Sequence, residues 1–88
     1  MEVHEFRLTA AGCERVQNDD AVRAALLACD ATLEGACPPG DTATPLRRFA
    51  YHPNDRGAIT MIVEFRLCLM DAFDVKGTGA LAALVEER

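Results

Sequence analysis

The sequence has few basic residues and lacks a cluster of them. Its 88 residues include nine basic and fourteen acidic side chains, which give a formal net charge of −5. Surfaces that bind nucleic acids gather Lys and Arg to displace counterions from phosphates. Here the only adjacent basic pair is Arg47 and Arg48. We therefore expect no direct nucleic-acid binding, whereas a mildly acidic surface suits a basic protein partner.

The sequence also lacks a segment that would target the chain to a membrane. Residues 1–5 have neither the positive nor the apolar region of a signal peptide. The longest apolar-rich run, residues 58–70, contains Glu64 and Arg66 and is too short to cross a bilayer. Without an export signal, the four cysteines at positions 13, 29, 37 and 68 are expected to be reduced thiols. We expect a cytoplasmic protein.

No closely spaced metal ligands or catalytic motif occur. Zinc ligands usually come as pairs such as Cys-x-x-Cys, but fifteen, seven and thirty residues separate the successive cysteines. Nothing in the spacing places His4 or His52 beside a cysteine, as a cysteine nucleophile with a histidine base would require. We expect no metal, no cofactor and no catalytic residues, and a non-enzymatic role is favoured.

Alternating and helical patterns predict the first half of the fold. Residues 2–10 alternate between apolar and polar side chains, which is typical of a half-buried strand. Residues 20–34 carry apolar side chains at helical spacing and predict a helix. Residues 36–45 predict a loop because they are rich in Pro and Gly. Residues 46–52 predict a second strand, and the turn formers at 53–57 predict a hairpin.

The segment 58–70 has the greatest influence on the predicted fold. Its odd-numbered positions from 59 to 69 are all apolar, and the opposite face is mixed, so the pattern predicts a long third strand buried on most of both faces. Residues 72–75 fit a short strand or a loop. Thr78 is placed to cap a final helix over residues 79–87.

Together these elements predict a single α+β domain over residues 1–88. The expected architecture is a two-layer sandwich of order β-α-β-β-(β)-α, with the third strand between the other two. This arrangement is ferredoxin-like with a short or missing last strand. Because many unrelated functions share such a fold, it says little about function.

Two functional hypotheses remain. In the first, the protein is a small acidic interaction module, with an inhibitor, immunity-type or accessory-subunit role, that binds a protein partner, itself as a homodimer, or both. The open edge of the first strand and the uncovered sheet face would form its interface, with Ile62, Cys68 and Met70 exposed on that face. The alternative is a dimeric α+β barrel-type small-molecule-binding protein or enzyme. Its pocket would be lined by side chains between sheet and helices, namely His4, Tyr51, His52, Phe65 and Cys68.

A weaker hypothesis concerns the glycines before the last predicted helix. Lys76, Gly77, Thr78 and Gly79 could let backbone amides converge on an anion, helped by the helix dipole. The phosphate-loop signature is absent, and an ordinary loop with a threonine cap is the alternative.

Overall fold

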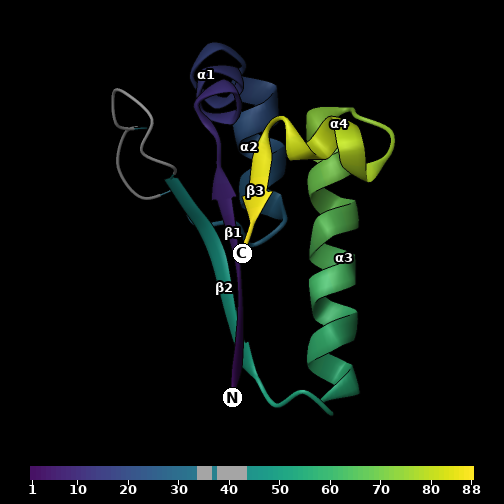
Figure 1. Ribbon diagram of the computed structural model, residues 1–88. Coiled ribbons are helices and arrows are strands. Elements are labelled where there is room, and N and C mark those ends of the chain that lie inside the picture. Colours follow the sequence, from purple (N-terminus) through teal and green to yellow (C-terminus); the bar gives the residue numbers. More distant parts are fainter. Residues whose placement is uncertain (34–36, 38–43) are drawn as a thin grey trace.

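The computed structural model describes residues 1–33, 37 and 44–88, and these form an α+β fold with a three-stranded antiparallel sheet and four helices (Figure 1). The sheet order is β2-β1-β3, with the first strand in the centre. The elements in chain order are β1 (Glu2–Leu8), α1 (Ala10–Asn18), α2 (Asp20–Ala28), β2 (Thr44–Tyr51), α3 (Arg56–Phe73), α4 (Thr78–Ala82) and β3 (Val85–Glu87).

Both strands predicted in the first half of the chain are confirmed. β1 and β2 pair antiparallel from Glu2 opposite Tyr51 to Leu8 opposite Thr44, with one irregularity in the register. β3 pairs with the second half of β1, so the predicted open edge of the first strand is wrong there. The last predicted helix is also wrong in part, because the chain is helical only over α4 and then extends into β3.

The helix predicted over residues 20–34 is confirmed as α2 but ends earlier. Cys29 caps it, and Asp30 adopts a positive φ of 62° that stops the helix; residues 34–36, like most of the predicted loop, lie outside the described residues. α1 was not predicted, because residues up to Ala10 were assigned to the first strand and Gly12 to the break after it, whereas the helix begins at Ala10. The structure needs a glycine at position 12, since a Cβ on Gly12 would collide with the carbonyl oxygen of Leu84.

The predicted third strand is wrong, because residues 58–70 belong to the helix α3. Asp55 caps this helix by accepting a hydrogen bond from the Ala58 amide at 3.1 Å, so the predicted hairpin is a turn into a helix. The segment is apolar at both strand and helix spacing, and burial of one side of the helix decides between them. The buried side carries Ile62, Phe65, Leu69 and Phe73.

This helix changes the architecture from the one predicted. The element order is β-α-α-β-α-α-β and is not clearly ferredoxin-like, because the described residues contain no strand between β2 and α3. Residues 72 and 73, expected in a strand or loop, complete α3, and Asp74 ends it in the left-handed conformation with φ of 53°.

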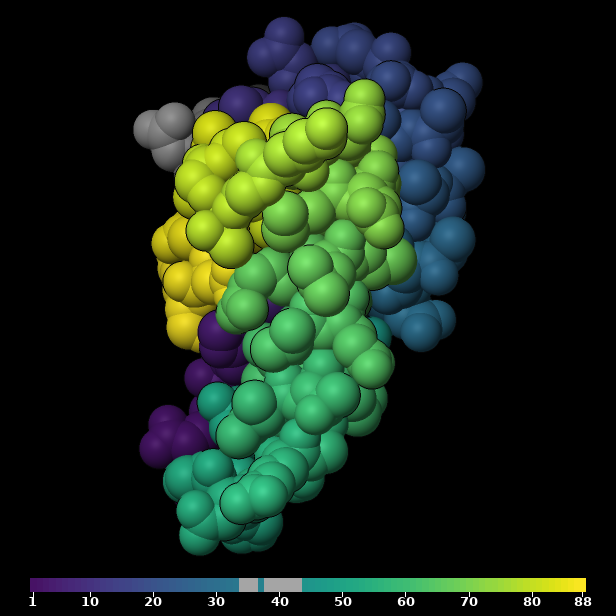
Figure 2. All heavy atoms as spheres, turned by 90° about the vertical axis from the view of Figure 1, so that its right-hand side faces the viewer, coloured from purple at the N-terminus to yellow at the C-terminus, as the bar shows by residue number. Residues whose placement is uncertain are grey.

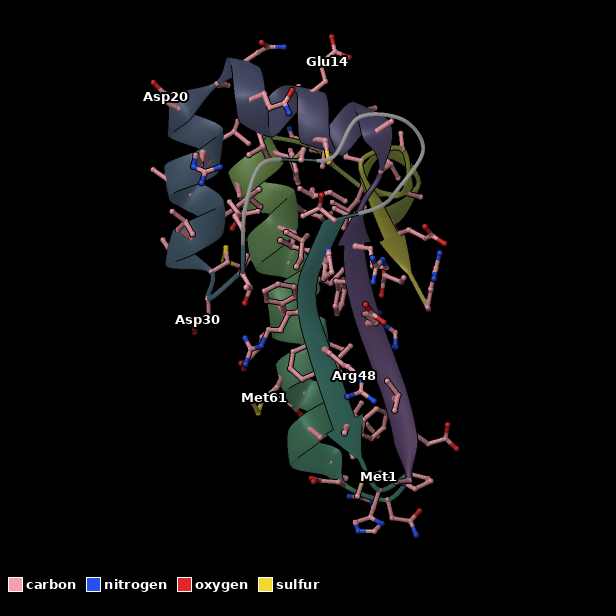
Figure 3. All side chains as sticks on the ribbon, turned by 90° about the vertical axis from the view of Figure 1, so that its left-hand side faces the viewer. Met1, Glu14, Asp20, Asp30, Arg48 and Met61 are labelled. Carbon is pink, nitrogen blue, oxygen red and sulfur yellow. A yellow bond between two sulfur atoms is a disulfide. The ribbon has the colours of Figure 1, made fainter. Side chains whose placement is uncertain are left out.

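The core lies between the sheet and the helices α2 and α3, and in Figure 3 no described element lies over the opposite face of β1 and β2. Three aromatic rings join β1, β2 and α3: the Phe6 ring centroid lies 4.9 Å from that of Phe65 and 6.1 Å from that of Phe49. These edge-to-face contacts hold α3 against the sheet. As a result, the opposite side of α3 faces outward.

Candidate functional site

An apolar stripe runs along the outer side of α3. Ile59, Val63 and Leu67 retain 43%, 43% and 54% of their accessible surface. Residues four apart lie on one side of a helix, so these three side chains form a continuous row, the α3 stripe. Figure 2 shows α3, in green, facing the viewer along most of its length with no other described element in front of it. Three large apolar side chains are therefore left exposed together on a rigid element.

Polar side chains border the α3 stripe. Arg56 at the start of the helix, Thr60 and Glu64 beside the stripe, and Asp71 near its end are exposed. Met70 is half-buried at the same side. Within the described residues, neither Arg56 nor Asp71 forms an ion pair. An apolar row with a charged rim is the general pattern of a protein interface.

On the other flank, a charged network ties α3 to the sheet. Arg66 donates to both carboxylate oxygens of Glu87 on β3, at 2.8 to 3.1 Å, and the ring Nε2 of His4 lies 2.9 Å from Oε1 of the same residue. Partial burial opposes the ionisation of Glu87, but the hydrogen bonds with Arg66 and His4 outweigh it and lower the Glu87 pKa. The same carboxylate raises the pKa of Arg66. His4 therefore has a structural partner rather than a place in a pocket.

The predicted interface residues are not exposed as a group. Ile62 is buried in the core with 6% of its surface accessible, Cys68 is half-buried in a disulfide, and Met70 is half-buried. The sheet face on which they were expected does not exist, because the segment is a helix. The three residues of the α3 stripe are exposed, although they belong to the face that was expected to point inward.

Cys29 and Cys68 form a disulfide, so the prediction of reduced thiols is wrong for this pair. The bond joins the end of α2 to the middle of α3, with the two Cα atoms 5.9 Å apart. The strand expected at 58–70 concealed this pairing, because it placed the two cysteines in unrelated elements.

The disulfide borders a small cavity of about 280 Å³. Phe65 and Met61 form apolar parts of its lining, and Arg47 and Glu64 contribute charged groups. The Arg47 guanidinium lies 4.6 Å from the ring centroid of Phe49 and 5.3 Å from that of Phe65 and so covers these aromatic faces. Of the predicted pocket residues, Phe65 and Cys68 line this cavity.

The remaining predicted pocket residues lie elsewhere. Tyr51 is half-buried at the end of β2, paired in register with Glu2, and His52 is exposed in the turn that follows. Together with His4 on the Glu87 network, they lie outside both the cavity beside the disulfide and the cavity beneath α1. The structure does not bring the predicted histidine pocket together.

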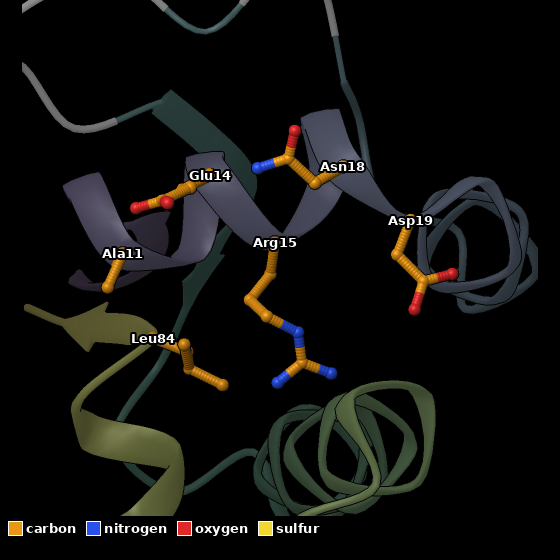
Figure 4. A pocket seen from close by; sticks show the side chains of 6 residues that line it. All are labelled: Ala11, Glu14, Arg15, Asn18, Asp19 and Leu84. Carbon is orange, nitrogen blue, oxygen red and sulfur yellow. The ribbon is translucent and has the colours of Figure 1, made fainter.

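The larger cavity, of about 500 Å³, lies beneath α1 (Figure 4). Arg15 extends into it from α1, and its guanidinium donates to the Phe73 carbonyl at 3.2 Å and lies 5.8 Å from the Phe73 ring centroid. Asp19, at the rim, accepts hydrogen bonds from the first amides of α2 as its N-cap. These polar groups already have structural roles, and Ala11, Glu14, Asn18 and Leu84 complete the lining.

The two other cysteines lie close to each other. The Cys13 thiol is buried and lies 3.3 Å from the hydroxyl of Thr44. Burial and a hydrogen bond with Cys13 raise the pKa of the Cys37 thiol, against a smaller opposing effect of Thr44. A raised pKa keeps the thiol protonated, which is the poorly nucleophilic form.

The predicted anion-binding loop is an exposed turn between α3 and α4. Lys76, Thr78 and Gly79 are exposed, and Gly77, with φ of 87°, takes the N-cap position predicted for Thr78. α4 has only five residues, and no side chain caps it. The dipole of such a short helix is small, so it attracts an anion to this turn only weakly.

Within the part of the chain that the structure describes, no group of three or more His, Cys, Asp or Glu side chains is arranged to hold a metal ion. No described helix is long and apolar enough to cross a membrane. Comparisons with protein families, with curated proteins and with solved structures found no match. The function must therefore be argued from the surfaces themselves.

Proposed function

We propose that this protein is a small interaction module that acts by binding a protein surface through the α3 stripe. The observation that carries the proposal is the row of Ile59, Val63 and Leu67, each about half exposed on one side of an 18-residue helix. Completing the burial of such a side chain contributes on the order of 1 kcal/mol. Three in a row give a partner several kcal/mol, which is the recognition mode of a helix lying in an apolar groove.

The charges at the rim of the stripe support a protein partner that carries opposite charges. Arg56 lies at one end of the stripe, Glu64 beside it and Asp71 near the other end, and all three are exposed. An accessory or inhibitory subunit would use the apolar row for affinity and the charged rim to orient the partner. The small-molecule alternative has less support, because Arg15 and Arg47, the arginines of the two cavities, both make internal contacts.

A matched pair of variants tests the proposal. Ile59→Gln with Leu67→Gln removes the stripe, and Leu27→Gln removes an equally exposed apolar side chain from α2. All these positions are exposed, so both variants should keep the fold, which circular dichroism checks. We expect tagged wild-type protein and the Leu27 variant to retain the same binding proteins, including untagged copies of itself, and the stripe variant to lose them. Equal retention by all three would refute the proposal.

A further inference from the structure

We propose that the occupant of the α3 stripe is a second copy of this chain, with the two α3 helices antiparallel about a two-fold axis at Val63. This inference rests on the proposed function, since it names the partner of the same surface. It is carried by two observations: the symmetry of the stripe about Val63, and the placement of opposite charges at its two ends.

The stripe is self-complementary when two helices run in opposite directions. Ile59 and Leu67 lie four residues before and after Val63, or about 6 Å along the axis. In an antiparallel pair, each Ile59 meets Leu67 of the second copy, and the two Val63 side chains meet at the axis. The same patch then serves both copies, as a closed two-fold interface requires.

The charges at the ends of α3 favour the antiparallel direction. Arg56 lies seven residues before Val63 and Asp71 eight residues after it, spacings that keep both near the side of the stripe. In an antiparallel pair, Arg56 of each copy faces Asp71 of the other, whereas a parallel pair would bring like charges together. Both side chains are exposed, and within the described residues neither has an ion-pair partner. The helix dipoles also oppose each other in this arrangement.

The rim is compatible with the pairing. Glu64 follows Val63 directly and therefore points about 100° away from it around the helix, into solvent. Arg66 is held by Glu87 on the opposite flank and does not compete for Asp71. Because the contact is confined to one helix, it is smaller than a permanent interface. We expect a reversible dimer with a dissociation constant in the micromolar range.

A charge exchange tests the partner and its direction. Arg56→Asp or Asp71→Arg alone places like charges opposite each other at both ends of the seam, and we expect each to weaken the dimer by about tenfold. The double variant restores opposite charges and should recover wild-type association by sedimentation equilibrium. An acidic residue at the start of α3 and a basic residue near its end each interact more favourably with the helix dipole than the native residues do. A loss of dimer would therefore not come from a less stable helix.

Cysteine cross-linking tests the two-fold axis, in a Cys37→Ser background. Val63→Cys should give a disulfide-linked dimer under mild oxidation. Ile59→Cys should not, because its two copies would be about 12 Å apart along the seam, too far for a disulfide. Cross-linking of both variants would indicate parallel helices and overturn the inference.

The outcomes separate this inference from the proposed function. A wild-type chain that is monomeric at several hundred micromolar, or a double charge variant that does not recover association, refutes the second copy. If the stripe variant nevertheless loses captured proteins, the interaction function stands and the stripe binds a different protein. If the stripe variant changes neither dimerisation nor capture, both proposals fail.

Discussion

The disulfide between Cys29 and Cys68 gives the most direct quantitative prediction. It closes a loop with a sequence separation of 39 residues, which contains β2 and the first two-thirds of α3. Opening it returns conformational freedom to the unfolded chain. On the loop-entropy relation, a loop of this length corresponds to about 4 kcal/mol at 25 °C. A domain of 88 residues typically has roughly 4–13 kcal/mol of total stability, so the cross-link is a large part of it.

Reduction of the disulfide should therefore lower the free energy of unfolding by about 4 kcal/mol and the melting temperature by roughly 15–30 °C. Urea unfolding followed by circular dichroism, with and without dithiothreitol, measures the first quantity. The Cys29→Ala and Cys68→Ala double variant should have about the stability of the reduced wild type. It should be slightly less stable, because the variant also loses the packing of the buried Cys29 sulfur.

The double variant is also the control, because reductant should leave its stability unchanged. If the wild type unfolds at the same urea concentration in both redox states, the bond either does not form or does not constrain the unfolded chain. In that case the reasoning from loop length is wrong. If dithiothreitol lowers the stability of the wild type but not that of a Cys37→Ser variant, the bond that it opens would be one between Cys13 and Cys37 instead.

Substitutions at three further positions test particular contacts. Gly12→Ala should destabilise by about 2 kcal/mol in thermal melts, although alanine usually favours helices, because its Cβ would collide with the carbonyl of Leu84. Asp55→Ala should cost about 1 kcal/mol in urea unfolding by removing the N-cap of α3, whereas Asp55→Asn should keep most of it. Glu87→Gln should cost less than about 1 kcal/mol at pH 7, because its contact with Arg66 is partly exposed. The Glu87 pKa is lowered in the folded state, so its contribution is lost as the pH falls below the ordinary value of 4.5, and wild type and variant should converge there.

The strands could be predicted because one of their faces is polar. In β1, Glu5 and Arg7 alternate with the buried Phe6 and Leu8, a pattern that helical spacing does not reproduce. α2 was predicted for the corresponding reason, since its apolar residues follow only the helical period. Where a segment is polar on one side, the period identifies the element without tertiary information.

Residues 58–70 could not be assigned in this way, because apolar residues fill almost every position. Two signals in the sequence nevertheless favour a helix: Asp55 is placed as an N-cap, and Thr60, Glu64 and Asp71 fall four and seven residues apart on one side. This error also changed the predicted interface. A strand places Ile59, Val63 and Leu67 on a buried face, whereas in the helix they lie on the exposed side. The disulfide could not be predicted either, because it depends on the packing of α2 against α3.

The central place of β1 in the sheet has a consequence for how the chain folds. Its first residue pairs with Tyr51 and its middle with Glu87, so both of its neighbours are distant in sequence. The helices need only local contacts and can form within microseconds, whereas the sheet must wait for two long loops to close. We expect refolding to be limited by the docking of β1 between its partners. Folding should be faster when the cysteines are already joined, because one of the two searches is then shortened.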